Sequence, residues 1–192
     1  MSSPNKVRVG YLGPDNCTFG FQAFTQAFSV EAGICHDRPN PIPFTNHYDI
    51  CDAVGRLDVR YGVIAIENSI DGVVAETVRA IESVSNHLGL YVCGEVTVPI
   101  KLFYMSKSGE EKLPKRLLSH STALGQCRKF VAELQKQGVS IEVRTSTGQA
   151  AKDALVDPDA AALASQLALD HYQLKTIRPN SVTDHKNSCT RF

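Results

Sequence analysis

Short apolar strands alternate with segments of helical periodicity along almost the whole chain, and this alternation limits the possible fold more than any other feature. Residues 6–12 (KVRVGYL), 61–66 (YGVIAI) and 116–119 (RLLS) are typical of buried strands, and apolar residues at helical spacing follow each of them. Strands that alternate with helices of about ten to fifteen residues predict parallel or mixed sheets with helices on both faces. We therefore expect an α/β fold.

The rest of the chain continues this order. Helices are expected from Thr18, around 50–57, 74–84 and 123–134, and over 165–172, with further strands at 139–145, 161–164 and 174–177. Ser146 is expected to cap a helix that ends at Asp157-Pro158, because Gln149 stands three residues later in the capping-box position. The proline-rich stretch 39–43 is expected to be a loop, and the long extended segment 90–105 is expected to connect two lobes.

Composition and charge exclude several classes of partner and cofactor. The 192 residues carry 20 basic and 20 acidic side chains, so no positive excess favours nucleic acid or an anionic membrane. No apolar run has the length of a signal peptide or membrane span, which predicts a soluble, cytoplasmic chain. The six cysteines include no Cys-x-x-Cys pair, so free thiols are expected, without a zinc site. The glycine patterns of nucleotide-binding loops are also missing.

Polar side chains follow several of the expected strands at the points where helices begin. They are Thr18, Asn68-Ser69, Ser119-His120 and Ser146-Thr147. Ligands of α/β folds bind at the carboxyl ends of strands, and this set of hydroxyls and amides suits a small anion. Helix capping explains the same residues, and both interpretations remain open at this point. Glu67 adds a carboxylate at a strand end, where burial would be costly without a partner.

The last residues, Asn187 to Phe192, carry hydroxyls, a thiol and an arginine beyond the last confident strand. They fit either a frayed terminus or a functional segment. Cys189 is a poor candidate nucleophile, because no base is identifiable for it.

Six segments together resemble prephenate dehydratase, the enzyme of phenylalanine biosynthesis. They are YLGP…TF (11–19), AIENSIDG (65–72), SHSTALGQCRKF (119–130), STGQAA (146–151), AALASQLALDHYQL (161–174) and TRF (190–192). The resemblance implies a two-lobed fold similar to type II periplasmic binding proteins, with the substrate between the lobes. We expect lobe 1 to comprise 1–97 and 177–192, and lobe 2 to comprise 98–176.

The resemblance also implies a reaction and its residues. Prephenate loses CO2 and its ring hydroxyl to give phenylpyruvate, without a cofactor or metal. The family's threonine, which assists departure of the hydroxyl, falls on Thr190, and its other catalytic residues fall on Asn68, Ser119 and Gln126. The dianionic substrate needs convergent donors, and the expected binding residues are Thr18, Glu67, Ser69, Ser146, Thr147, Arg191 and Phe192.

Two of these expected roles have alternatives. Glu67 is expected to orient its neighbours, because a carboxylate beside the reacting carboxylate would repel it. Arg191 is expected to form a bidentate pair with a substrate carboxylate. Its alternative role is a clamp, paired with Glu67 or Asp184, that fixes the loop of Thr190.

The sequence also departs from the family pattern. Ser188 stands where asparagine is usual, Ser121-Thr122 replaces Pro-Gln, and the first loop is one residue longer. The sequence ends at Phe192, ahead of the place where the family's ACT domain would follow, so regulation through that domain is not expected within these residues. A homodimer is expected from the apolar surface left uncovered. Alternative functions are a non-aromatising prephenate decarboxylase, an arogenate dehydratase, and a non-catalytic small-molecule-binding module.

Overall fold

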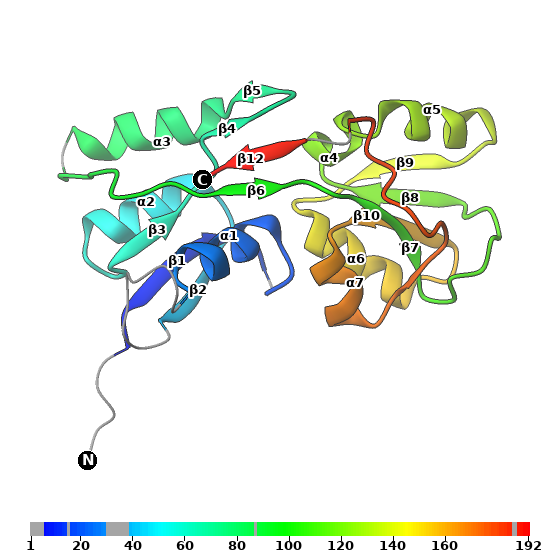
Figure 1. Ribbon diagram of the computed structural model, residues 1–192, viewed down its shortest axis with the longest axis horizontal. Coiled ribbons are helices and arrows are strands. Elements are labelled where there is room, and N and C mark those ends of the chain that lie inside the picture. Colours follow the sequence, from blue (N-terminus) through cyan, green and yellow to red (C-terminus); the bar gives the residue numbers. More distant parts are fainter. Residues whose placement is uncertain (1–5, 15, 30–38, 87, 186–187) are drawn as a thin grey trace, which may run out of the picture. The chain divides into compact units, whose positions relative to one another are not determined.

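The chain forms two compact units in a computed structural model, and each unit is described by itself (Figure 1). The structure describes residues 6–14, 16–29, 39–86, 88–185 and 188–192. Unit 1 combines Met1–Gly13, Phe19–Val98 and Cys189–Phe192, and unit 2 combines Pro14–Thr18 and Pro99–Ser188. The predicted α/β class with two lobes and mixed sheets is confirmed.

The boundary of the two units differs from the expected lobes at the last segment. Residues 177–192 were expected in lobe 1, whereas only Cys189–Phe192 belong to unit 1. The reason is a set of backbone hydrogen bonds to unit 2. Ile177 N donates to Tyr104 O at 2.8 Å, and Val182 N donates to Leu102 O at 2.9 Å.

A short stretch near the amino terminus also belongs to unit 2. Pro14–Thr18 was expected in lobe 1, but its described residues pack on unit 2. Ser165 Oγ donates to Cys17 O at 2.8 Å, and a Cβ added to Gly148 would meet Cys17 Sγ at 3.1 Å. Glycine at position 148 therefore lets this stretch approach helix α6 (Thr147–Val156) closely.

The first sheet of unit 1 is parallel, with the strand order β2-β1-β3. Its strands are β1 (Arg8–Leu12), β2 (Asn40–Phe44) and β3 (Tyr61–Val63). The expectation of a loop at 39–43 is wrong, because β2 is an edge strand. Asn40 N donates to the carbonyl oxygen of Val7, the residue before β1. Proline has no N–H to donate, and Pro41 and Pro43 occupy the alternate positions of this edge strand, where the N–H would point away from β1.

Three helices accompany this sheet: α1 (Phe19–Ala27), α2 (His47–Gly55) and α3 (Ala75–Ser85). Helix α2 has a regular cap, since Asn46 accepts from Asp49 N at 2.8 Å. Helix α3 packs on α2 through Cys51, Ala80 and Val84. Side chains at helical spacing thus form the core that the sequence predicts for this unit.

The second sheet of unit 1 brings distant parts of the chain together. Its order is β5-β4-β12-β6, with β4 (Glu67–Asn68), β5 (Gly72–Val73), β6 (Thr97–Pro99) and β12 (Cys189–Arg191). Strand β12 runs antiparallel to β4, with Thr190 opposite Asn68. Phe192 and Val96 then exchange two backbone hydrogen bonds, at 2.9 and 3.0 Å. The last residues are therefore an interior strand and not a frayed end.

Unit 2 has a mixed five-stranded sheet in the order β11-β7-β10-β8-β9. The strands are β7 (Phe103–Ser106), β8 (Arg116–Ser119), β9 (Ser140–Val143), β10 (Ala160–Ala164) and β11 (Lys175–Thr176). Strands β8, β9 and β10 are parallel, whereas β7 runs antiparallel to β10. Three carboxyl ends therefore meet at one edge of the sheet, as the alternating pattern predicts.

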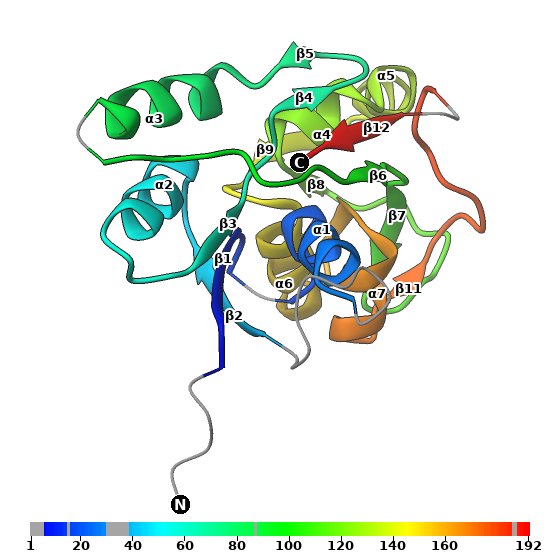
Figure 2. The same ribbon diagram turned by 60° about the vertical axis from the view of Figure 1, so that its left-hand side comes forward.

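Helices cover both faces of this sheet. They are α4 (Ser121–Gly125), α5 (Arg128–Lys136), α6 (Thr147–Val156) and α7 (Gln166–Tyr172). Figures 1 and 2 show α5 on one side of the sheet and α6 and α7 on the other. Alanines of α6 pack on alanines of β10, and these small side chains allow a close approach. No helix of the described residues is long and apolar enough to cross a membrane.

Candidate functional site

The predicted catalytic residues Asn68 and Thr190 form one hydrogen-bonded pair in unit 1. Asn68 Nδ2 donates to Thr190 Oγ1 at 2.8 Å, although the two residues are 122 positions apart in the sequence. Opposed positions on the antiparallel strands β4 and β12 bring them together. Both residues are nearly buried, with exposed fractions of 4% and 8%. The sheet thus holds the two side chains in a fixed relation.

The orientation of the Asn68 amide follows from its other contacts. Its Oδ1 accepts from Ile70 N at 2.9 Å and from Asp71 N at 3.3 Å. The carbonyl oxygen must therefore face these backbone donors, and the amide nitrogen must face Thr190. Thr190 Oγ1 is then an acceptor, so its own proton is available to a further group. Among the described residues, no hydrogen bond takes that proton.

Strand β12 carries Arg191 next to Thr190, and its guanidinium forms an ion pair with the Glu67 carboxylate. Glu95 lies 4.0 Å from the same guanidinium. About half of each of the Arg191 and Glu67 side chains is exposed. The structure therefore shows the pairing with Glu67 that the sequence left as an alternative. Contact between Arg191 and the substrate remains a prediction.

Ser69 joins the loop after β4 to β12. Its Oγ accepts from Cys189 N at 3.0 Å, and its N donates to Cys189 O at 3.0 Å. Phe192 follows on the same strand and is bound through its backbone to Val96. Ser69 and Phe192 therefore help to fix β12, and their predicted role in substrate binding is not tested by these contacts.

Ser119 and Gln126 lie in unit 2, and both are buried. Ser119 ends β8, and its Oγ donates to Leu163 O at 2.7 Å. Its hydroxyl proton is therefore occupied, and only its oxygen is left to accept from a ligand. Gln126 is the residue directly after α4, and Ser188 Oγ donates to its Oε1 at 3.4 Å. Gln126 thus contacts the residue two positions before Thr190.

The remaining predicted binding residues gather at the start of α6. Ser146 caps this helix, because its Oγ accepts from Gln149 N at 2.9 Å, which confirms the capping prediction. Thr147 is nearly buried in the first turn. A Cβ added to Gly148 would lie 3.2 Å from Thr18 Cγ2 and 3.7 Å from Ser146 Oγ. Thr18, Ser146 and Thr147 are therefore neighbours within unit 2.

The predicted residues thus fall into two sets. Unit 1 holds the residues of β4, its following loop and β12, and unit 2 holds the residues at the ends of β8 and α4 and at the start of α6. Burial, together with a smaller effect of the Asp184 carboxylate, raises the pKa of the Cys127 thiol, beside Gln126, to about 12. This thiol is therefore neutral near pH 7. The described residues contain no group of three or more His, Cys, Asp or Glu placed to hold a metal ion.

A separate pocket of about 600 Å³ lies in unit 2, and none of the predicted site residues lines it. Arg178 stands over the Phe130 ring there, with 4.9 Å from Cζ to the ring centroid, and pairs with Glu133 at 2.8 Å. Its cation is therefore already matched by a carboxylate.

Two contacts near the site were not predicted from the sequence. Asp184 binds the first turn of α5, and Ser188 binds Gln126. The sequence carried no signal for the first of them, because one continuous helix was expected across Gln126-Cys127 and a helix start at Arg128 was not predicted.

Known proteins of the same fold include enzymes of different kinds. The structure is similar to that of a prephenate dehydratase from Arthrobacter aurescens in complex with L-Phe, with a TM-score of 0.79 and 25% identity over 97% of this chain and 59% of that one. It also resembles a structure described as a quorum-quenching acylase, GqqA, with a TM-score of 0.73, 22% identity and coverage of 96% and 62%. That second likeness concerns the fold alone.

Sequence comparison is more specific than the fold. The prephenate dehydratase family model matches residues 9–192, so the chain belongs to the prephenate dehydratase family. It is 32% identical to a bifunctional chorismate mutase/prephenate dehydratase of Aquifex aeolicus, covering 100% of this chain and 49% of the relative. It is 30% identical to a prephenate dehydratase of Bacillus subtilis, covering 97% and 62%. The chain therefore spans about half to three fifths of these relatives.

Proposed function

We propose that this chain catalyses the decarboxylating dehydration of prephenate to phenylpyruvate. Membership of the prephenate dehydratase family supports this proposal. The observation that carries it is the direction of the Asn68–Thr190 hydrogen bond, in which Thr190 is the acceptor. A hydroxyl that accepts in this way directs its own proton toward another group, and a chain of hydrogen bonds strengthens each donor in it.

The reaction makes a modest demand on Thr190. The bond between the ring and its carboxylate breaks, and its electron pair enters the ring as CO2 leaves. The ring hydroxyl departs at the same time and takes up one proton overall to become water. Aromatisation drives both steps, so Thr190 needs only to donate a hydrogen bond to the departing oxygen. Positioned proton donors of this kind contribute roughly 10²- to 10⁴-fold in rate.

The other predicted residues are assigned roles that their contacts permit. Asn68 orients the Thr190 hydroxyl, and Gln126 supports the chain before it through Ser188. Ser119 offers an oxygen that accepts from a ligand. The remaining predicted residues are proposed to bind the two substrate carboxylates: Thr18, Glu67, Ser69, Ser146, Thr147, Arg191 and Phe192. Glu67 contributes through Arg191, because a carboxylate cannot bind another directly.

The test is conversion of prephenate by the purified chain, followed by the appearance of phenylpyruvate and of CO2. Thr190→Val keeps a β-branched side chain in β12 and replaces the hydroxyl by a methyl group. We expect turnover to fall roughly 10²- to 10⁴-fold while substrate affinity changes little. A non-aromatic dihydro product would instead indicate decarboxylation alone, and binding without turnover would indicate a binding module. Arogenate is compared as a second substrate, with phenylalanine as its product.

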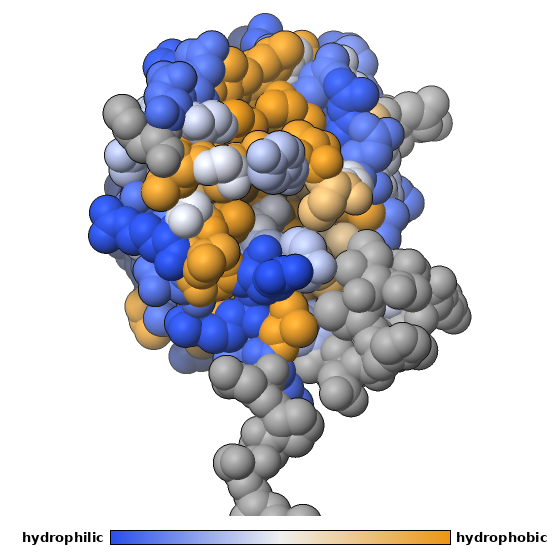
Figure 3. Space-filling view, turned by 90° about the vertical axis from the view of Figure 1, so that its left-hand side faces the viewer, coloured by the Kyte–Doolittle hydropathy of each residue, from blue (hydrophilic) through white to orange (hydrophobic). Residues whose placement is uncertain are grey.

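We also propose that the chain works in the cytoplasm as a homodimer. The free thiols of Cys17, Cys51 and Cys127 are buried, which suits a reducing compartment. Figure 3 shows hydrophobic side chains gathered on the face of unit 1 seen from the side of α2 and α3. Tyr91 and Val92 of this unit are about 90% exposed, and symmetric association would cover such side chains. A monomer mass in light scattering would contradict the dimer.

A further inference from the structure

Helix α5 begins without a cap from its own neighbouring residues. Cys127 precedes it with a ψ of 33°, and its side chain makes no capping hydrogen bond. The caps of α2, α6 and α7 have ψ between 163° and 165°, the extended conformation from which a side chain reaches the N–H groups of the first turn. The first turn of α5 also contains no acidic residue. Its free N–H groups therefore need an acceptor from elsewhere.

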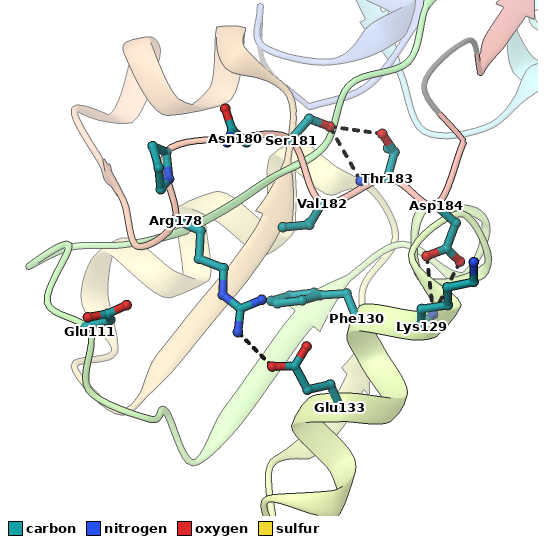
Figure 4. Close-up of a pocket in the computed structure, with 11 residues that line it drawn as sticks. Glu111, Lys129, Phe130, Glu133, Arg178, Asn180, Ser181, Val182, Thr183 and Asp184 are labelled. Atoms are coloured by element: carbon teal, nitrogen blue, oxygen red, sulfur yellow. Dashed lines mark hydrogen bonds and ion pairs between the residues drawn. The ribbon is translucent and has the colours of Figure 1, made fainter.

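Asp184 supplies that acceptor from a segment that is remote in sequence. Both of its carboxylate oxygens accept from Lys129 N, at 3.3 and 3.2 Å, across 55 positions. Figure 4 shows the Asp184 side chain directed at the start of α5, with both contacts drawn. Asp184 N donates in turn to Gln126 O at 2.8 Å. One residue thus binds the helix through its side chain and through its backbone, and its negative charge suits the positive end of the helix dipole.

Two described residues on either side of Asp184, Ser181 and Ser188, make further contacts with the same unit. Before Asp184, Ser181 Oγ donates to Leu102 O at 3.1 Å. After it, Ser188 Oγ donates to Gln126 Oε1, and Ser188 O accepts from Ile100 N at 2.7 Å. The chain then enters β12, where Thr190 is the second residue. Asp184, which binds the start of α5, thus lies six positions before the proposed proton donor in the sequence.

We propose that Asp184 is a positioning residue for Thr190. This inference rests on the proposed function and adds a residue that acts at that site without contact to substrate. Asp184 attaches the chain that leads into β12 to the junction of α4 and α5, and so limits the positions at which β12 can place the Thr190 hydroxyl. Its loss loosens this attachment, because it removes the acceptor at the start of α5 and leaves the backbone bond to Gln126 O and, among the described residues, the side-chain bonds of Ser181 and Ser188. Substrate then meets a correctly placed donor less often.

The test compares Asp184→Ala with a matched helix-cap variant, Asn46→Ala. Asn46 caps α2, which has nine residues, as α5 has, and Asn46 lies outside the predicted site. Both variants are expected to lower Tm by a similar amount, since each removes one side-chain cap. Only Asp184→Ala is expected to lower kcat, by roughly three- to thirtyfold with KM nearly unchanged, as expected for loss of one cap that holds a reactive geometry. Asp184→Asn keeps an acceptor oxygen and is expected to restore most of kcat.

Hydrogen exchange measures the attachment without reference to activity. Asp184→Ala is expected to raise deuterium uptake in the peptide of residues 181–192 and in the first turn of α5, whereas Asn46→Ala leaves both unchanged. Equal kcat in Asp184→Ala and wild type, with Thr190→Val strongly impaired, would overturn the positioning role and leave the proposed function intact. Absence of prephenate turnover in the wild type would overturn the proposed function, and unchanged uptake in Asp184→Ala would separately overturn the attachment.

Discussion

Asn68→Asp tests the direction of the central hydrogen bond, because it replaces the donor by an acceptor of the same shape. Asn68 Nδ2 and Thr190 Oγ1 are 2.8 Å apart and nearly buried. In the variant, an ionised carboxylate oxygen faces the hydroxyl, and the only proton available between them belongs to Thr190. The bond therefore reverses, and Thr190 becomes its donor. The proton that we assign to the departing substrate hydroxyl is then held by the introduced carboxylate.

The size of the effect follows from the strength of that reversed bond. Hydrogen bonds to charged groups contribute roughly 1.5–3 kcal/mol. Each 1.36 kcal/mol on the barrier is a factor of ten in rate, so the held proton alone lowers kcat roughly 10- to 150-fold. Thr190→Val removes the donor completely, so its kcat gives the lower limit with which the kcat of Asn68→Asp is compared. Stability changes less than activity, because the carboxylate still accepts from Ile70 N and Asp71 N, so we expect Tm within about 4 °C of wild type.

The assay follows phenylpyruvate formation at saturating prephenate between pH 8 and pH 5, with an enzyme-free blank at each pH. Protonation of the new carboxyl gives it a proton to donate, which restores the original direction of the bond. The ratio of variant to wild-type kcat is therefore expected to rise as pH falls toward the carboxyl's ordinary pKa of about 3.9. A folded Asn68→Asp that keeps more than about a third of wild-type kcat at pH 8 would refute the reasoning.

Three further predictions concern single residues. Arg191→Lys tests the clamp against substrate contact. Because we propose that Arg191 binds a substrate carboxylate, we expect KM to rise tenfold or more. A fall in kcat and Tm with KM nearly unchanged would instead show that Arg191 only fixes β12 through its ion pair with Glu67. Ser119→Ala should lower kcat less than tenfold in the phenylpyruvate assay, since its proton is occupied by Leu163 O, and should lower the free energy of unfolding by about 1 kcal/mol in urea titrations. A kcat loss as large as that of Thr190→Val would give Ser119 a donor role. The pKa of Cys127 is about 12 in the folded chain, so the unfolded thiol ionises at a lower pH than the folded one. The free energy of unfolding is therefore highest below about pH 9 and falls as the pH rises from 9 to 12. Tm should therefore fall more steeply with pH above 9 in wild type than in Cys127→Ala.

The helices and most strands were predictable because their apolar spacing reports burial directly. Strand β8 has the predicted bounds of residues 116–119, and α6 begins after Ser146 and ends before Asp157-Pro158 as predicted. The helix expected over 123–134 is instead two helices, α4 and α5, interrupted at Gln126-Cys127. Periodicity could not indicate this break, because apolar residues keep helical spacing across it.

The site was less predictable than the fold, because its contacts join residues far apart in the sequence. The resemblance to a family selected Asn68 and Thr190, but their hydrogen bond depends on the register of β12 on β4, which no local pattern determines. The pairing of Arg191 with Glu67 follows from the same register, and the sequence offered it only as an alternative. Asp184 lies in a polar segment without periodicity, where a remote helix cap leaves no repeating signal.

The place of β12 inside its sheet has a consequence for the order of folding during synthesis. Strand β12 lies between β4 and β6, yet it is translated after all of residues 99–188. At about 5–20 residues per second, the ribosome needs roughly 6 to 24 s to pass from Asn68 to Thr190. During that interval unit 2 can bury its own alanine core, whereas β4 and β6 have no partner between them. Within these two units, the Asn68–Thr190 pair is therefore among the last contacts to form, and a ribosome-bound chain is expected to gain structure well before it gains activity.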